Sequence, residues 1–139
     1  MNKAIFRLAV IDDAEEINSV STHLGYQRLS ENQASEKLLS LLNSEADQIF
    51  VAELKGKIIG WIHLFYARRL ASNDFYEIGG LVVNPEYRGQ GIGKNLVKFA
   101  TSQVTEVVRV RCNETRLESH LFYEQQGFKS TKSQRVFVK

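Results

Sequence analysis

Cysteine, proline, tryptophan and methionine each occur only once in this sequence of 139 residues. Because Cys112 is alone, no internal disulfide framework can form, and the reducing cytoplasm is the expected compartment. No apolar run approaches the roughly 18 residues that a membrane-spanning helix requires, and the N-terminus lacks the pattern of a secretory signal. The chain has no low-complexity tract or repeat, so we expect a single domain over residues 1–139.

Charge is nearly balanced. Lys and Arg number 18 against 16 Asp and Glu, which gives a net charge of +2, and the basic residues are dispersed along the chain. This distribution argues against a nucleic-acid-binding surface. No His, Cys, Asp or Glu cluster has the spacing of a metal site, so no metal is expected.

Apolar periodicity predicts an α/β fold with a mixed sheet in the order β-α-α-β-β-β-α-β-α-β. The expected strands are Ala4–Val10, Gln48–Leu54, Ile58–Tyr66, Ile78–Val83, Val107–Cys112 and Arg135–Val138. The expected helices follow Asp12 and Asp13, Ser30 (with Gln33), Gly91, and Thr115 (with Glu118). Asp12, Asp13, Ser30 and Thr115 are candidate N-caps, and glycines at positions 25 and 127 are expected to end their helices.

The most informative stretch runs from Glu77 to Val97. An apolar strand ends at Asn84-Pro85, and after Arg88 three glycines precede a helix. The start of a helix carries unpaired N–H groups and a partial positive charge, so it is a ready site for phosphate. Glycine lets a pyrophosphate approach the backbone without meeting a Cβ. The alternative is a glycine turn that merely opens a packed helix.

Two familiar phosphate loops do not fit this stretch. The dinucleotide loop G-x-G-x-x-G would need glycine at Lys94 or Leu96, and the ATP loop G-x-x-x-x-G-K-[ST] would need glycine at Arg88 and a hydroxyl at Asn95. What remains, Arg88-x-x-Gly91-x-Gly93, resembles the R/Q-x-x-G-x-G/A signature of the GNAT superfamily of N-acetyltransferases. The resemblance implies acetyl-CoA as co-substrate, with no metal.

The resemblance also implies the residues that hold the coenzyme. In the family the sheet opens beside the central strand, and the pantetheine arm lies in the gap like an added strand. Gly79-Gly80 fits such an irregularity, because glycine inside a strand often marks a bulge. The implied coenzyme-binding residues are Leu81, Val82, Val83, Arg88, Gly89, Gln90, Gly91, Ile92, Gly93, Lys94, Asn113 and Tyr123. For Asn113, a turn that caps a helix is an equal alternative.

A second motif, Phe122-Tyr-Glu-Gln-Gln-Gly-Phe128, looks like the family segment F-Y-E-x-x-G-F. The match makes Tyr123 the candidate general acid for the departing CoA thiolate, because a phenol can donate a proton without adding a full charge. Helix periodicity alone favours a different interpretation, in which Tyr123 is an amphipathic aromatic residue that packs beside Phe122.

The acceptor amine must lose a proton before it attacks, because an alkyl amine with a pKa near 10.4 is mostly charged at pH 7. Glu77 stands eleven residues before Arg88, which matches the strand glutamate of histone-type family members, so it is the candidate base. Deprotonation through a chain of water molecules and a merely exposed carboxylate are the alternatives. His63 and His120 are expected to be structural. By family resemblance, the segment Tyr26–Leu29 contacts the acceptor.

The sequence therefore predicts direct transfer of acetyl from acetyl-CoA to a primary amine of a small molecule or peptide, with Tyr123 as acid and Glu77 as base. The alternative is a non-catalytic module that binds acyl-CoA as a sensor. The acceptor itself is not identified. Family members often pair, so a homodimer is possible, whereas no nucleic-acid or membrane partner is expected.

Overall fold

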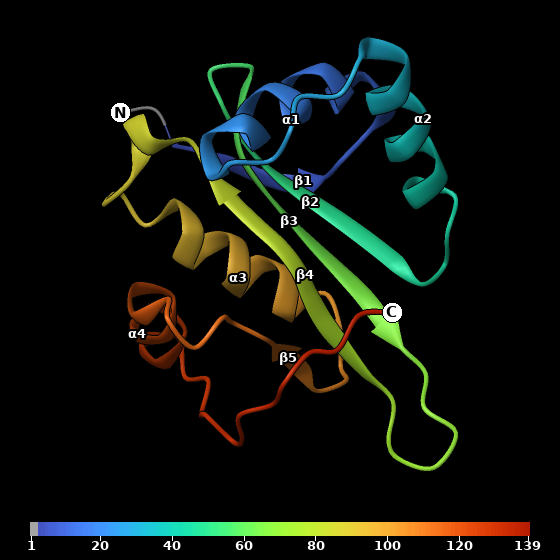
Figure 1. Cartoon of the computed structure of the whole chain (residues 1–139). Coiled ribbons are helices and arrows are strands. Elements are labelled where there is room, and N and C mark those ends of the chain that lie inside the picture. The colour runs from blue at the N-terminus through green and yellow to red at the C-terminus, as the bar shows by residue number, and fades with distance from the viewer. Residues whose placement is uncertain (1–2) are drawn as a thin grey trace.

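The computed structural model describes residues 3–139, in which five strands form one sheet in the order β1-β2-β3-β4-β5 (Figure 1). The strands are β1 (Ile5–Leu8), β2 (Asp47–Leu54), β3 (Lys57–Ala67), β4 (Phe75–Val83) and β5 (Val108–Val110). The helices are α1 (Ala14–Ser21), α2 (Glu31–Leu42), α3 (Ile92–Ser102) and α4 (Leu117–Gln125). Neighbouring strands are antiparallel except β4 and β5, which are parallel. This confirms the predicted mixed α/β fold and the crossover through α3.

The sheet is covered on both faces, with α1 and α2 on one side and α3 and α4 on the other (Figure 1). The core under α3 joins Phe50, Ile62 and Leu64 of the sheet to Leu96 and Ala100 of the helix. A second core lies under α1 and α2 and includes Leu38, Val51 and Ile58. Alternate residues of β3 therefore lie on opposite faces of the sheet: Ile62 and Leu64 pack in the core under α3, while Trp61 packs against the second core.

Several predicted helix ends and turns are confirmed. Ser30 and Gln33 form a capping box, in which the Ser30 Oγ accepts from the Gln33 N–H at 3.2 Å and the Gln33 Oε1 accepts from the Ser30 N–H at 3.0 Å. Gly25 and Gly127 follow helices in the left-handed conformation, with φ of 85° and 92°. This is the geometry that favours glycine at the end of a helix.

Four predictions about local structure are wrong. Residues 135–138 are not a strand: they are exposed and make no ladder, since alternating apolar residues form a strand only where an edge pairs with them. Asp13 does not cap α1 through its side chain. Instead its carboxylate is buried and accepts hydrogen bonds from Arg7 at 2.8 and 2.9 Å. Thr115 does not cap α4, because Arg116 holds the N-cap position.

The fourth error concerns the ends of strands. β4 begins at Phe75 rather than Ile78, and β5 is confined to Val108–Val110 within the predicted Val107–Cys112. The short β5 is important for the candidate site, because it leaves most of β4 without a neighbouring strand on its β5 side.

Candidate functional site

Strands β4 and β5 form a fork. They pair only at Tyr76–Val108, Glu77–Arg109 and Ile78–Val110, while β4 continues to Val83. Within residues 3–139, the β5-side edge of residues 79–83 therefore has no strand partner. Backbone N–H and C=O groups on such an edge are free to pair with an extended ligand. This opening lies where the sequence predicts that the pantetheine arm binds.

The predicted irregularity at Gly79-Gly80 is present. The register of β3 and β4 shifts between His63 and Leu64, so that His63 pairs with Gly80 and Leu64 with Ile78, leaving Gly79 as the extra residue of a bulge. A Cβ on Gly80 would lie 2.8 Å from the Trp61 ring, and one on Gly79 would lie 3.1 Å from the Phe65 ring. Glycine is therefore required here because aromatic side chains of β3 occupy the space.

The glycine-rich loop joins β4 to α3. Gly89 and Gly91 have φ of 76° and 78°, and Gly91 is the N-cap of α3. The N–H groups of Ile92, Gly93 and Lys94 open the helix and have no acceptor within it. No atom lies within 4 Å of a Cβ placed on Gly89. The loop thus joins the end of β4 to a helix start with the backbone geometry on which the phosphate-site prediction depends.

Contacts between α3, α4 and β4 hold this loop next to Tyr123. A Cβ on Gly93 would lie 3.4 Å from the Phe122 ring and 3.6 Å from Val83. The Tyr123 ring packs against the rings of Phe122 and Phe128, with centroid separations of 5.0 and 5.5 Å. The two sequence motifs, which are distant along the chain, therefore meet at the fork.

Burial raises the pKa of Tyr123 to about 12. Smaller effects come from Cys112 and Tyr26, which also raise the pKa, and from Arg116, which lowers it. Cys112 follows β5, and the Tyr26 hydroxyl lies 3.7 Å from where a Gly80 Cβ would be. With its pKa raised to about 12, the Tyr123 phenol stays protonated at neutral pH.

Glu77 is buried, with 4% of its side chain exposed, so the interpretation as an exposed carboxylate is wrong. Its Oε1 accepts a hydrogen bond from the Nε of Arg109 at 2.7 Å, and its Oε2 accepts one from the Nε of Arg111 at 3.0 Å. The Nη2 atoms of the two arginines form ion pairs with the same oxygens at 2.6 and 2.9 Å. Each of its oxygens is therefore engaged by one arginine, which argues against Glu77 as the group that takes a proton from the acceptor.

The other candidate residues have clear contacts. The Asn113 Oδ1 accepts from the Thr115 N–H at 3.0 Å, which favours the turn interpretation, and its backbone carbonyl accepts from His120 Nε2 at 2.9 Å. His63 Nε2 lies 2.7 Å from Asp47 Oδ1 on the face of the sheet that carries Trp61. Among residues 3–139, no group of His, Cys, Asp and Glu side chains is arranged to hold a metal ion.

Sequence reasoning missed Arg109, Arg111 and Trp61 as parts of this region. The alternation Arg-Val-Arg within a predicted strand places both arginines on one face, and that signal could have been read. Trp61 donates from Nε1 to Ser21 Oγ at 2.9 Å and lies 6.3 Å from the Tyr26 ring. Its role could not be read, since it depends on how α1 is placed over the sheet.

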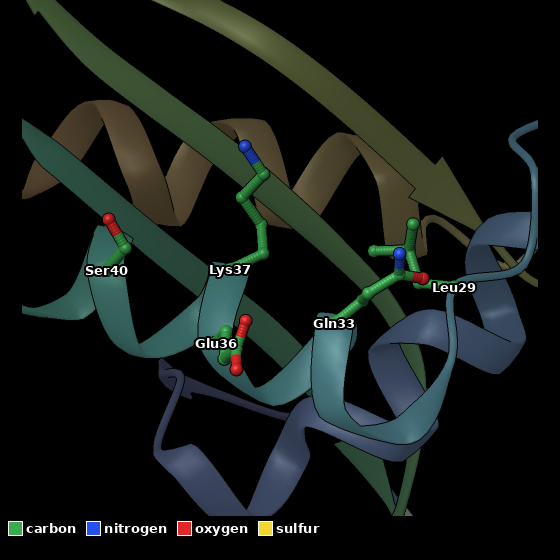
Figure 2. Close-up of a pocket in the computed structure, with 5 residues that line it drawn as sticks. All are labelled: Leu29, Gln33, Glu36, Lys37 and Ser40. Atoms are coloured by element: carbon green, nitrogen blue, oxygen red, sulfur yellow. The ribbon is translucent and has the colours of Figure 1, made fainter.

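A separate depression of about 400 Å³ lies on the exposed side of α2. Figure 2 shows that Gln33, Glu36, Lys37 and Ser40 come from the helix, and that Leu29 comes from the connection before it. None of the coenzyme-binding or catalytic candidates lines it. It therefore adds nothing to the fork site beyond placing Leu29 at a surface.

The fold is that of known N-acetyltransferases. The crystal structure of glucosamine-6-phosphate N-acetyltransferase from Arabidopsis thaliana superposes with a TM-score of 0.82 at 19% identity, covering 98% of both chains. An aminoglycoside 6'-N-acetyltransferase from Acinetobacter baumannii gives a TM-score of 0.81 at 14% identity, covering 99% of this chain and 98% of that one. At such identities the likeness establishes the fold alone.

Sequence comparison establishes the family. Residues 11–128 match the Acetyltransferase (GNAT) family, and the chain belongs to it. An uncharacterized N-acetyltransferase of Archaeoglobus fulgidus is 28% identical over 104 residues, covering 67% of each protein. The aminoalkylphosphonate N-acetyltransferase of Salmonella typhimurium is 33% identical over 81 residues, covering 55% of this chain and 53% of that protein. Within residues 3–139, no helix is long and apolar enough to cross a membrane.

Proposed function

We propose that this chain transfers the acetyl group of acetyl-CoA directly to a primary amine of a small molecule or peptide. The observation that supports this best is the convergence of three features at one place: the unpaired edge of β4, the open amides after Arg88 and the buried Tyr123. They suit the pantetheine arm, the diphosphate and the thioester sulfur of one extended ligand.

The donor side is built from backbone groups. In the proposal, the pantetheine arm pairs with the free edge of residues 81–83, and the amides of residues 89–94 bind the diphosphate together with Arg88. A β4 amide beside the bulge polarises the thioester carbonyl, since an N–H aimed at a developing oxyanion stabilises it more than the ground state. The chemistry that acetyl-CoA supplies is an activated acyl group on a thiolate leaving group.

Tyr123 acts on the leaving group. A phenol with a pKa of about 12 is a weaker acid than a thiol of ordinary pKa near 8.5, so complete transfer of its proton is uphill by about 5 kcal/mol. We infer that Tyr123 donates a hydrogen bond to the sulfur while the C–S bond breaks. The thiolate takes its final proton through that contact or from water.

The contacts of Glu77 favour a structural role in this scheme over the role of base. It ties β5 and the residue that follows it to β4 next to the fork, and each of its two oxygens is already in contact with an arginine. The proton of the acceptor therefore leaves by another route, through water or another group on the same face.

The test is thiol release from acetyl-CoA with a panel of amines. The panel includes aminoalkylphosphonates, amino sugar phosphates, aminoglycosides and lysine peptides, since three of these are named as substrates of similar proteins. We expect Tyr123→Phe to lower turnover at least tenfold while CoA affinity, measured by calorimetry, is kept. Tyr66→Phe is the matched control, because its hydroxyl bonds only to Asp74 in an exposed position.

Two results would contradict the proposal. If no amine releases thiol and calorimetry detects no CoA, the donor site is wrong. If CoA binds but no amine reacts, and Tyr123→Phe changes nothing, the chain is a sensor of acyl-CoA rather than an enzyme.

A further inference from the structure

The face of the sheet that carries Glu77 holds a second titratable pair, formed by His63 of β3 and Asp47 of β2. Their side chains are 22% and 17% exposed, and His63 Nε2 lies 2.7 Å from Asp47 Oδ1. An ionised carboxylate only accepts hydrogen bonds, so the contact requires the proton on Nε2. In neutral His63 the lone pair is therefore on Nδ1.

The Nδ1 atom of His63 faces the bulge of β4. It lies 3.3 Å from where a Cβ on Gly79 would be, and Gly79 itself is exposed. A side chain at this bulge would fill the space that Nδ1 borders. Because position 79 carries glycine and is exposed, no β4 side chain covers Nδ1 at this position, and the Phe65 ring borders the bulge beside it.

The second glycine of the bulge, Gly80, lies on the side of the site where the leaving group is proposed to bind. Gly80 lies next to the Trp61 ring and close to the Tyr26 hydroxyl. Tyr26 is also one of the groups that raise the pKa of Tyr123. His63 Nδ1 and the Tyr26 hydroxyl thus lie beside adjacent glycines of the bulge, the first at Gly79 and the second at Gly80. A thioester held at residues 80–81 would have a phenol on one side and an imidazole on the other.

We propose that His63 is the general base for the acceptor amine and that Asp47 is its positioning residue. This rests on the proposed acetyl transfer. His63 Nδ1 takes a proton from the ammonium form of the acceptor, and the Asp47 carboxylate stabilises the imidazolium that results. The neutral amine then attacks the thioester carbon, a C–N bond forms, and the C–S bond breaks with its electron pair on sulfur.

The protons balance in this scheme. The acceptor loses two as its ammonium becomes an amide: the one held on His63 passes to solvent, and the second, lost from nitrogen after attack, balances the one that the thiolate gains. Glu77 is not a second base in this scheme, because Arg109 and Arg111 form ion pairs with its two carboxylate oxygens. Asp47 is the charged group in contact with His63, whereas Glu77, Arg109 and Arg111 pair with one another at the β4–β5 edge.

The experiment measures kcat/KM for the amine against pH in the wild-type protein, His63→Gln and Asp47→Asn. His63→Gln should lower kcat/KM about 10²–10⁴-fold near pH 7. The loss should shrink as pH rises, because more of the amine is then already neutral. CoA affinity should not change, and His23→Gln, on an exposed histidine, should behave as wild type.

Asp47→Asn should show a smaller loss of kcat/KM, together with a displaced acidic limb of the pH profile. A merely structural Asp47 would lower stability without moving that limb. Nitrogen-15 NMR of the imidazole rings gives a readout independent of activity: neutral His63 should carry its proton on Nε2 in the wild-type protein and lose this preference in Asp47→Asn.

The proposal is overturned if an active wild-type enzyme keeps its kcat/KM within threefold in His63→Gln at every pH, or if neutral His63 carries its proton on Nδ1. Absence of acetyl transfer in the wild-type protein, by contrast, would remove the proposed function itself, and His63 as a base with it.

Discussion

Substitution of the buried Glu77 can distinguish two roles for its carboxylate: a structural role that ties β5 to β4, and a role as the catalytic base. Removing one partner of a fully buried ion pair costs about 3–5 kcal/mol. Here the arginine side chains are 32% and 59% exposed, so they regain water when Glu77 is lost, and the cost must be discounted. We therefore expect Glu77→Gln to lower the free energy of unfolding by about 1–3 kcal/mol, measured by urea denaturation.

The same tie fixes β5 at the point where the fork opens, so its loss should also affect the coenzyme. We expect CoA affinity to fall three- to tenfold in Glu77→Gln, which corresponds to about 0.6–1.4 kcal/mol. Arg111→Met removes half of the contacts and should give a smaller loss of the same kind. Arg68→Met, on an exposed arginine, is the control.

One pattern of rates would refute a purely structural role for Glu77. If Glu77→Gln lowers kcat by 10² or more at unchanged stability and CoA affinity, while Arg111→Met keeps or raises kcat, then Glu77 is the base. In that case Arg111 must leave the carboxylate during turnover. The expected outcome is a loss of the same kind in both variants, smaller in Arg111→Met, with the shape of the pH profile retained.

Two further predictions concern stability. Although burial opposes it, hydrogen bonds from Arg7 and the Val10 N–H lower the pKa of Asp13 below its ordinary value, so its stabilising effect is present above about pH 4 and is lost as pH falls through the lowered pKa. Asp13→Asn should therefore unfold at lower urea concentration at pH 7, and the difference from wild type should narrow below pH 4; a constant difference would contradict this. Phe137 is 86% exposed, so Phe137→Ser should change the free energy of unfolding by less than about 0.5 kcal/mol, whereas Leu96→Ala in the core should cost about 2–5 kcal/mol. A large effect at Phe137 in calorimetry would show that residues 135–138 do pack as a strand.

The backbone features of the candidate donor site, its glycine-rich loop and its bulge, could be predicted from the sequence because they depend on glycine. Gly89 and Gly91 need left-handed conformations, and an extra residue at Gly79 shifts the register, so glycines mark these positions directly. Side-chain partners were harder to predict. The burial of Glu77 depends on Arg109 of β5 and on Arg111 just after that strand, both more than 30 residues away. The hydrogen bond of His63 depends on the register of β2.

The bulge explains why donor and acceptor recognition should be separable. Gly79 and Gly80 are glycines because rings from β3 occupy the space above them: Phe65 and His63 over the first, and Trp61 over the second. Those rings lie on the face opposite the α3 core and do not belong to the glycine-rich loop. A change of ring size on β3 therefore reshapes the space next to the bulge while leaving the β4 edge and the loop amides intact. Acceptor preference should follow β3 and the Tyr26 segment, and coenzyme affinity should follow β4 and the start of α3.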